Sequence, residues 1–466
     1  MADQLAVEVA AMAPGARLPS QRELVRRFGA SATTVAHAVA MLARRGLLET
    51  RPGAGTFRAV AASAQVGDTS WQDAALELTA GLEERPGLSR RFSGAALSQV
   101  LSATSPGLVD LNGGYLHPTL QPAGLLAASL TRVSRRPEAW ERPPAAGVAA
   151  LRDWFAQDIG AGLTRYDILI TPGGQSALAT TLRALTGPGD AIVIEAPTYP
   201  GTIAAAHAAS LRTVPVPLDH EGITPEHLDE ALSRSRARVI VVQPLHQNPT
   251  GVTMSRQRQR EVLQVARAHN AFIVEDDFAR HLTHPGPWAT PAPLIADDPD
   301  GAVIHLRSLT KVTSPNLRIA AIAARGPVLG RLQAALTIDS LFVPAVLQHT
   351  ALEAVTAPGW RRCLTTLQTE LHHRRQLAAA AVVDVFGADA LAGMPRGGYH
   401  LWVGLRDHRS GAECARAALT SGAAVTPGEN YYAPGNDQRP HIRISFVAAP
   451  TAADVHSAIQ RLAAVA

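Results

Sequence analysis

Lys311 is the only lysine among the 43 basic side chains of this 466-residue chain, although lysine is one of the commonest residues of soluble proteins. Arginine carries the same charge, but its guanidinium stays protonated. A desolvated ε-amine loses its proton readily and can form a Schiff base with a carbonyl compound. The residue type at 311 therefore predicts covalent carbonyl chemistry. Compositional drift that spared one lysine by chance is the alternative, and the neighbouring residues argue against it.

Several polar residues have the types and positions that a phosphate group needs. Ser308 offers a hydroxyl just before the lysine, and Arg318 offers a guanidinium just after it. In the turn ThrProGlyGlyGlnSer (171–176), Gly174 and Gln175 begin a predicted helix, whose backbone amides can face an anion. Glycine-rich turns before helices also occur for steric reasons alone.

Other side chains could hold an aromatic ring. Asp276 ends an apolar segment, where a carboxylate is costly unless it meets a cation such as a protonated ring nitrogen. Tyr199 lies between prolines and could lie flat against a ring, or be a buried structural tyrosine. Asn248 begins an AsnProThrGly turn, which turn chemistry alone would explain. An amine, a phosphate cradle and a carboxylate for a pyridinium are together the requirements of pyridoxal phosphate.

Alternating strand-like and helix-like segments would bring these residues together. Helical patterns separate most of the apolar segments, which predicts a mainly parallel sheet covered on both faces. Functional groups of such sheets gather beyond the carboxyl ends of the strands. We expect strands at 167–171, 191–194, 238–243, 271–276, 302–306 and 319–323.

A smaller α+β lobe is predicted after about residue 345. It should contain a long helix near 361–385, strands at 399–405 and 441–446, and a closing helix at 452–465. The last strand carries Arg443 in the segment HisIleArgIleSerPhe.

The first sixty residues hold all of the net positive charge. They contain eight arginines and four acidic residues, whereas the rest of the chain has equal numbers of each sign. Such asymmetry suggests a nucleic-acid partner. A helix is expected at 4–12, a second after Ser20 with Glu23 closing a capping box, and a third after Ser31. Residues 46–57 predict two short strands around a ProGly turn, the wing of a winged helix-turn-helix.

The order of these motifs resembles the winged helix of the GntR regulators. The matching segments are LeuProSerGlnArgGluLeu (18–24), SerAlaThrThrVal (31–35) and GlyAlaGlyThrPhe (53–57). The resemblance implies contacts to DNA phosphates and base edges by Arg22, Ser31, Thr33, Thr34, His37, Arg51 and Gly53. Ala32 departs from the family, which usually has a guanine-contacting arginine there. A small helical domain with a solvated arginine face is the alternative.

The rest of the chain resembles the fold type I aminotransferases, and the whole resembles the MocR/GabR regulators. The resemblance implies that Lys311 forms the internal aldimine of pyridoxal phosphate and that Asp276 pairs with the pyridine nitrogen. Tyr199 would stack on the ring, and Asn248 would donate to the 3-oxygen. The implied phosphate ligands are Gly174, Gln175, Ser308 and Arg318. Arg443 would bind the carboxylate of a substrate or effector through its planar fork, unless it is only a surface strand residue.

These motifs divide the chain into three parts. A winged helix-turn-helix occupies residues 1–60, a linker 61–105, and an aminotransferase-like domain 106–466, with a large lobe at about 150–345 and a small lobe at about 346–466. The two cysteines have no metal-binding spacing, so neither a disulfide framework nor a metal site is expected. No apolar run reaches the roughly 18 residues of a membrane span. We expect a cytoplasmic protein that forms homodimers, the latter from the resemblance.

Phe278 is a departure with chemical consequences. The family commonly has a tyrosine just after the AspAsp pair, where it hydrogen-bonds the 3-oxygen and tunes the aldimine pKa. Phenylalanine leaves that contact to Asn248, so the aldimine should titrate higher, with cofactor binding retained and transamination slow. Residues 140–147 also lack a tyrosine that many relatives extend across the dimer to the phosphate.

Three functions remain open. The first is a transcription regulator that binds operator DNA and senses an amino compound as an external aldimine on Lys311. The second is an aminotransferase with a DNA-binding-like appendage. The third is a DNA-binding protein whose cofactor domain serves only dimerisation, which would make Lys311 dispensable. The basic helix-turn-helix and Phe278 favour the first.

Overall fold

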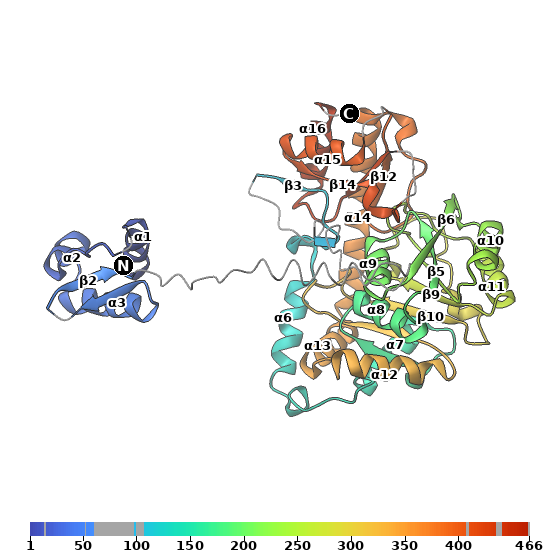
Figure 1. Ribbon diagram of the computed structural model, residues 1–466, viewed down its shortest axis with the longest axis horizontal. Helices are drawn as coiled ribbons and strands as arrows, with labels where there is room; N and C mark the ends of the chain where they lie inside the picture. Colours follow the sequence, from blue (N-terminus) through green and yellow to red (C-terminus); the bar gives the residue numbers. More distant parts are fainter. Residues whose placement is uncertain are drawn as a thin grey trace. The chain divides into compact units, whose positions relative to one another are not determined.

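The computed structural model describes residues 1–13, 15–51, 53–59, 97–98, 107–406, 410–434 and 440–464. The chain forms two compact units, Met1–Gly81 and Leu82–Ala466 (Figure 1). Most of the linker predicted at 61–105 lies outside the described residues. The second unit nevertheless includes Leu97, which falls inside that predicted linker.

The first unit is a three-helix bundle with a two-stranded wing. Ser20 caps the second helix through a capping box with Glu23, and Ser31 caps the third by accepting from the amide of Thr34 at 3.1 Å, as predicted. Leu5, Leu24 and Leu42 are buried between the helices. The elements are α1 (Ala2–Ala11), α2 (Gln21–Phe28), α3 (Ala32–Arg44), β1 (Leu48–Arg51) and β2 (Gly55–Arg58).

The second unit is built on an eight-stranded sheet in the order β4-β11-β10-β9-β8-β5-β6-β7. Strands β6, β5, β8, β9 and β10 are mutually parallel, while β11 is antiparallel to both of its neighbours. The strands are β4 (Ile168–Thr171), β5 (Ala191–Ala196), β6 (Arg212–Asp219), β7 (Gly222–Ile223), β8 (Val239–Val242), β9 (Phe272–Asp277), β10 (Val303–Ser308) and β11 (Ala320–Ala323). The mainly parallel sheet is confirmed.

Two apolar layers cover this sheet, because successive strand residues point to opposite faces. Ile168 and Ile170 pack into one cluster, and Leu169 between them packs into the other. Helices α7, α10, α11 and α13 contribute to the first layer, and α8, α9 and α12 to the second. The helices are α6 (Ala123–Val133), α7 (Ala149–Ile159), α8 (Gly174–Leu185), α9 (Pro200–Ala208), α10 (Pro225–Ser235), α11 (Arg256–Ala268), α12 (Val328–Ser340) and α13 (Ala345–Thr356).

A smaller lobe follows the long helix α14 (Trp360–Phe386), drawn in orange to red in Figure 1. Its three-stranded sheet has the order β12-β15-β14, and β13 pairs with β3 from much earlier in the chain. That pairing leads the chain after β3 towards the carboxyl ends of the large sheet. The elements are β3 (Val109–Asp110), β12 (His400–Gly404), α15 (Gly411–Thr420), β13 (Ala423–Ala424), β14 (Thr426–Pro427), β15 (His441–Ser445) and α16 (Ala452–Arg461).

Short 3₁₀ helices complete the described chain at Pro118–Leu120, Pro137–Ala139, Arg165–Asp167, Arg280–Leu282, Leu294–Asp297, Ala388–Ala390, Gly428–Tyr431 and Leu462–Ala464. Strand β6 was missed in the sequence because Pro215 and Pro217 interrupt its pattern. Both prolines are tolerated because β7 pairs only with Leu218 and Asp219, so the outer side of β6 at Pro215 and Pro217 is an open edge among the described strands. Among the described helices none alone has the length and apolarity of a membrane span, although the bent pair α12 and α13 together meets that test.

Candidate functional site

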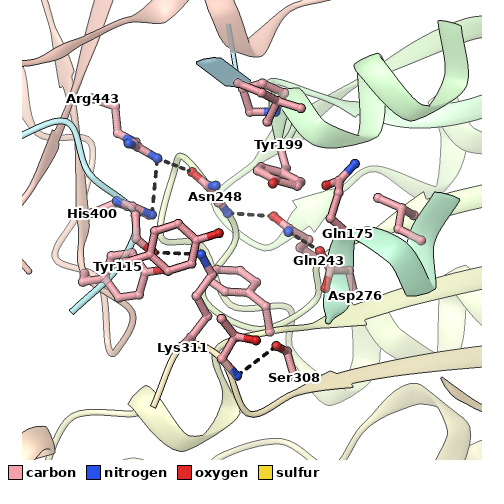
Figure 2. A pocket seen from close by; sticks show the side chains of 18 of the residues that line it. Tyr115, Gln175, Tyr199, Gln243, Asn248, Asp276, Ser308, Lys311, His400 and Arg443 are labelled. Carbon is pink, nitrogen blue, oxygen red and sulfur yellow. Dashed lines mark hydrogen bonds between the residues drawn. The ribbon is translucent and has the colours of Figure 1, made fainter. Parts of the chain in front are cut away.

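A cavity of about 320 Å³ opens beyond the carboxyl ends of the large sheet, between the two lobes of the second unit (Figure 2). Every residue predicted to contact the cofactor or the substrate carboxylate lines it. These are Gly174, Gln175, Tyr199, Asn248, Asp276, Ser308, Lys311, Arg318 and Arg443. The convergence of nine residues from six separate segments supports the strand-end argument made from the sequence.

Lys311 lies in the turn after β10, at the base of the cavity. Its Nζ donates to the carbonyl of Gly114 at 2.8 Å and lies 3.9 Å from the centre of the Tyr115 ring. Burial, with a further contribution from the Arg443 guanidinium, lowers the pKa of Lys311 to about 7. A substantial fraction of the amine is therefore uncharged near neutral pH, and the uncharged amine is the nucleophile.

Asp276 is the penultimate residue of β9 and accepts a 2.7 Å hydrogen bond from Nε2 of Gln243. Burial raises the pKa of Asp276 to about 6, while the Gln243 hydrogen bond acts in the opposite direction. A protonated ring nitrogen beside this carboxylate would compensate for its burial. The geometry therefore suits the predicted pairing with a pyridinium.

The N-terminus of α8 forms one end of the cavity. Gly173 has φ +102°, and a Cβ there would lie 2.4 Å from Nη2 of Arg318, so the close approach of the guanidinium requires glycine. No side chain caps this helix, which leaves its first amides available to an anion. Gly174 faces Ser308, whose Oγ would lie 3.9 Å from a Cβ at position 174. Amides, a hydroxyl and a guanidinium thus converge on one phosphate-sized position.

Tyr199 and Gln175 pack against a second glycine. A Cβ on Gly201 would lie 2.2 Å from the Tyr199 ring and 2.3 Å from Oε1 of Gln175. Nε2 of Gln175 donates to the Gly201 carbonyl at 3.0 Å. Glycine at 201 therefore lets the tyrosine ring and the glutamine amide occupy the same wall of the cavity.

Arg443 reaches the cavity from β15 of the small lobe and is only 2% exposed. Its Nη1 donates to Oδ1 of Asn248 at 3.4 Å, and its Nη2 donates to Oγ1 of Thr426 at 3.2 Å and to the carbonyl of Asn112. These partners are all neutral. A buried guanidinium bound only to neutral acceptors can bind a ligand carboxylate strongly, which excludes the surface role considered from the sequence.

Phe278 lines the cavity just after β9 and meets the Tyr399 ring edge to face, with 6.5 Å between ring centres. The hydroxyl of Tyr399 donates to the Gly114 carbonyl at 2.9 Å. Tyr399 therefore does not offer its proton to a ligand in place of the tyrosine that Phe278 replaces.

Sequence reasoning missed several residues that line the cavity, namely Leu97, Tyr115, Gln243, Thr310, Tyr399, His400 and Tyr431. Gln243 follows β8 directly, so the strand-end argument could have found it. Tyr115 reaches the site through the long-range pairing of β3 with β13, which no local pattern indicates.

Buried polar atoms on the cavity wall fit a bound cofactor and its ligand. Within the described residues, these atoms have no hydrogen-bond partner, and they include acceptors as well as donors. They are Gln175 Oε1, Thr310 Oγ1, His400 Nδ1, Tyr431 Oη and Arg443 Nε. Buried polar groups are normally satisfied, so a polar occupant of this cavity is expected. Together with the α8 cradle, the residues present fit pyridoxal phosphate.

An ion-pair network lies behind Asp276. Asp277 accepts from Arg307 at 3.0 Å and from Arg280, and these guanidiniums hold its pKa well below the usual range although burial opposes them. His305 contacts Glu275 at 2.8 Å. Ligand atoms of Glu275, Asp277 and His305 lie within 4.8 Å of one another, but the two guanidiniums already neutralise Asp277. The network is best explained as support for β9.

The predicted DNA-contacting residues lie at the surface of the first unit. Arg22 on α2 and the residues that begin α3 are exposed, including Ser31, Thr33, Thr34 and His37. Arg51 pairs with Glu49 at 3.2 Å and lies over the Phe57 ring. Gly53 has φ +76° at the tip of the wing, where a side chain would be strained. These residues remain predictions, as no nucleic acid contact is described.

Comparison with known proteins agrees with the two-unit architecture. Residues 136–462 match the family model "Aminotransferase class I and II", and residues 7–57 match "Bacterial regulatory proteins, gntR family". The fold and site thus define a pyridoxal-phosphate protein of fold type I joined to a helix-turn-helix. The chain belongs to the class I and II aminotransferase family, with the domain arrangement of the MocR/GabR regulators.

The chain has relatives among transcriptional regulators and among aminotransferases. The chain is 26% identical over 438 residues to the uncharacterized HTH-type transcriptional regulator YdfD of Bacillus subtilis, covering 93% of this chain and 88% of the relative. It is 28% identical to the uncharacterized HTH-type transcriptional regulator YdcR of Escherichia coli, and the match covers 92% of this chain and 91% of the relative. It is also 28% identical to a 2-aminoadipate transaminase of Thermus thermophilus, and this match covers 76% of this chain and 90% of the transaminase.

Solved structures of aminotransferases have the fold of the second unit. The α-aminoadipate aminotransferase LysN of Thermus thermophilus, complexed with N-(5'-phosphopyridoxyl)-L-leucine, superposes with a TM-score of 0.74 at 27% identity, over 82% of this chain and 97% of LysN. A kynurenine aminotransferase of Pyrococcus horikoshii gives 0.73 at 26% identity, over 84% and 98%.

Proposed function

We propose that this protein is a pyridoxal-phosphate-dependent transcription regulator that binds operator DNA and responds to an amino compound. The observation that carries the proposal is the joining of two candidate sites, one for DNA and one for the cofactor, in one chain. The first unit exposes the polar residues of a capped recognition helix, and the second holds a buried amine, carboxylate and guanidinium around one cavity.

DNA binding would use the basic surface of the first unit. Seven of its eight arginines are exposed, and the amide-rich start of α3 carries Ser31, Thr33 and Thr34. Helix N-termini and hydroxyls position a protein on phosphates, while His37 and Arg22 can reach base edges. Arg51 and Gly53 would bring the wing to the backbone. Because its partner would be operator DNA, we also propose that the protein acts in the cytoplasm.

The cavity would recognise two groups of its ligand, an amine and a carboxylate. Bound pyridoxal phosphate supplies an aldehyde that condenses with amines and a ring that withdraws electrons. Lys311, partly uncharged at neutral pH, can accept or release a proton beside that aldehyde, and Asp276 holds the ring nitrogen protonated. Arg443 would bind the carboxylate of the amino compound through its fork. The proposed effector is therefore an amine that also carries a carboxylate.

Ligand binding can be coupled to a change in shape through Arg443. This residue belongs to the small lobe, and its 3.4 Å contact to Asn248 joins it to the large lobe. A ligand carboxylate on Arg443 would compete with that contact and change how the lobes meet. Such a differential interaction is what a ligand needs to shift a conformational equilibrium.

A homodimer is the proposed assembly. In the second unit Ile338 (85%), Leu341 (66%) and Phe342 (37%) are all exposed within five residues at the end of α12, and a cluster of exposed apolar side chains is typical of an interaction surface. An Ile338→Glu variant should dissociate at concentrations where the wild type sediments as a dimer. A wild type that sediments as a monomer would contradict this assembly.

An aminotransferase is the second candidate, favoured by the intact set of Lys311, Asp276 and Arg443 in the cavity. Phe278 argues against efficient turnover, because it provides no hydroxyl to the cofactor and the nearby Tyr399 hydroxyl is bound to Gly114. Replacing Phe278 with tyrosine should change the pH at which the bound cofactor's absorbance titrates. Identical titrations of both proteins would remove this argument.

The test is DNA binding by the full-length protein to duplexes selected from a random pool, with and without each amino acid. Single-turnover spectra on the same samples report chemistry at the cofactor. The proposal expects selective DNA binding that at least one amino acid alters. Rapid amino transfer with no sequence-selective DNA binding would instead establish the aminotransferase.

A further inference from the structure

Gln243 bridges two residues that line the cavity, Asp276 and Asn248 (Figure 2). Its Nε2 donates to Oδ2 of Asp276 at 2.7 Å, and its Oε1 accepts from the backbone amide of Asn248 at 3.0 Å. The side chain is 4% exposed. We propose that Gln243 is a positioning residue that sets the spacing between the partner of the ring nitrogen and the partner of the 3-oxygen, and that keeps Asp276 ionised.

The sheet register explains why residue 243 can do this. Strands β8 and β9 are parallel neighbours, and Val242 pairs with Glu275. One residue further along each strand, Gln243 therefore lies beside Asp276. Asn248 is in the loop that follows β8, so a single amide links this loop to the end of β9. Within the described residues, Gln243 supplies the side-chain hydrogen bond to Asp276.

Charge in the surroundings makes this hydrogen bond consequential. The pKa of Asp276 is raised to about 6 as a net effect, because burial and the Asp277 carboxylate raise it more than the Gln243 amide, Lys311 and His305 lower it. Glu195, whose own pKa is raised to about 8 by burial, lies close enough to interact with Asp276. A protonated carboxyl has no negative charge to pair with a pyridinium, so loss of Gln243 would raise the pH below which Asp276 binds the ring nitrogen only weakly.

Gln247 is a matched control from the same loop. It is equally buried, at 1% exposure, and its Nε2 donates to Pro197 and Glu195 at 2.8 and 3.2 Å. Its Oε1 accepts from Thr250. Gln247 therefore supports the loop without contacting Asp276.

The experiment measures the affinity of the full-length, cofactor-free protein for pyridoxamine 5'-phosphate as a function of pH. This probe does not condense with Lys311, so its affinity reports the ring contacts. Gln243→Met should bind about tenfold more weakly at neutral pH, because hydrogen bonds to charged groups contribute that much. The pH of half-maximal affinity should rise by about one unit. Gln247→Met should not raise the midpoint, because loss of its hydrogen bond favours the uncharged form of Glu195, which is a neighbour of Asp276.

An unshifted midpoint in Gln243→Met, or the same shift in Gln247→Met, would overturn the proposal. Gln243→Glu covers the case in which the methionine variant fails to fold, because glutamate has nearly the same shape and keeps an acceptor for the Asn248 amide. It should raise the midpoint at least as much, and a wild-type midpoint would refute the role of the donor. This inference rests on the cofactor and not on DNA binding, so a protein that ignores DNA leaves the result interpretable.

Discussion

The two units of this protein differ in their arginines, because only the second unit, which also has exposed ones, buries any of them. In the first unit seven of eight arginines are exposed to solvent. In the second unit Arg307, Arg374, Arg375 and Arg443 are buried, each held by several hydrogen bonds. Exposed arginines attract a polyanion through additive, salt-sensitive contacts. A buried arginine instead fixes one geometry, and its loss leaves its partners uncompensated.

The largest effect is expected where a buried arginine neutralises a buried carboxylate. Arg307→Met would leave Asp277 and Asp158 without their contacts at 3.0 and 2.6 Å, which should cost about 3 kcal/mol in the free energy of unfolding. Arg234→Met is the control, since its exposed pair with Glu230 should contribute less than about 1 kcal/mol. Equal losses in urea denaturation would break the contrast between buried and exposed arginines.

Arg443→Leu should weaken ligand binding more than it lowers the free energy of unfolding. Loss of the guanidinium should weaken the response of cofactor absorbance to a carboxylate-bearing amine about a hundredfold. Arg375→Leu also removes a buried guanidinium, one that donates to the Pro395 carbonyl away from the cavity. Its ligand affinity should remain within about twofold of the wild type. A similar loss of affinity in both variants would mean that Arg443 acts only through the fold.

The pH dependence of cofactor attachment tests the buried amine. The folded-state pKa of Lys311 is lowered to about 7, so the uncharged amine increases as the pH rises through that value. The rate at which pyridoxal phosphate attaches to cofactor-free protein should therefore rise through about pH 7 and then level off. A rate that keeps rising towards the ordinary lysine pKa of 10.5 would show that the amine is not desolvated.

The smallest effects are expected for single exposed arginines of the first unit. Arg22→Ala should weaken DNA binding roughly tenfold and reduce its salt dependence. Arg51→Ala should cost less, because Arg51 already pairs with Glu49. Arg234→Ala, on the second unit, should have no effect. Equal losses from all three in fluorescence anisotropy would indicate non-specific attraction instead of a defined interface.

The sequence predicts the residues that would hold the cofactor better than the residues that line the rest of the cavity. Asp276 and Ser308 lie at the ends of buried strands and Lys311 follows one, and parallel strands bring their carboxyl ends together, so local patterns suffice. Tyr115 depends on the pairing of β3 with β13, more than three hundred residues apart. Leu97 lies in a segment that composition assigns to a linker. A contact between segments that lie far apart in the sequence leaves no periodic pattern in either segment.

The winged helix could also be predicted from the sequence, because its caps and turn are local patterns. Ser20, Glu23 and Ser31 form the predicted caps, and the two predicted strands of the wing, β1 and β2, pair with each other. The missed strand β6 shows the limit, since its two prolines are acceptable only beside a sheet edge. Its position in the sheet, which overrides its local pattern, is known only from the tertiary structure.

The central claim is that Lys311 lets the protein sense an amino compound. The most direct measurement is operator binding by Lys311→Arg, which keeps the charge but removes the nucleophile, compared with the wild type across a titration of the effector amine. The account predicts that the variant binds DNA with unchanged affinity in the absence of the amine and does not respond to it. A Lys311→Arg protein whose DNA affinity still changes with the amine would contradict the account.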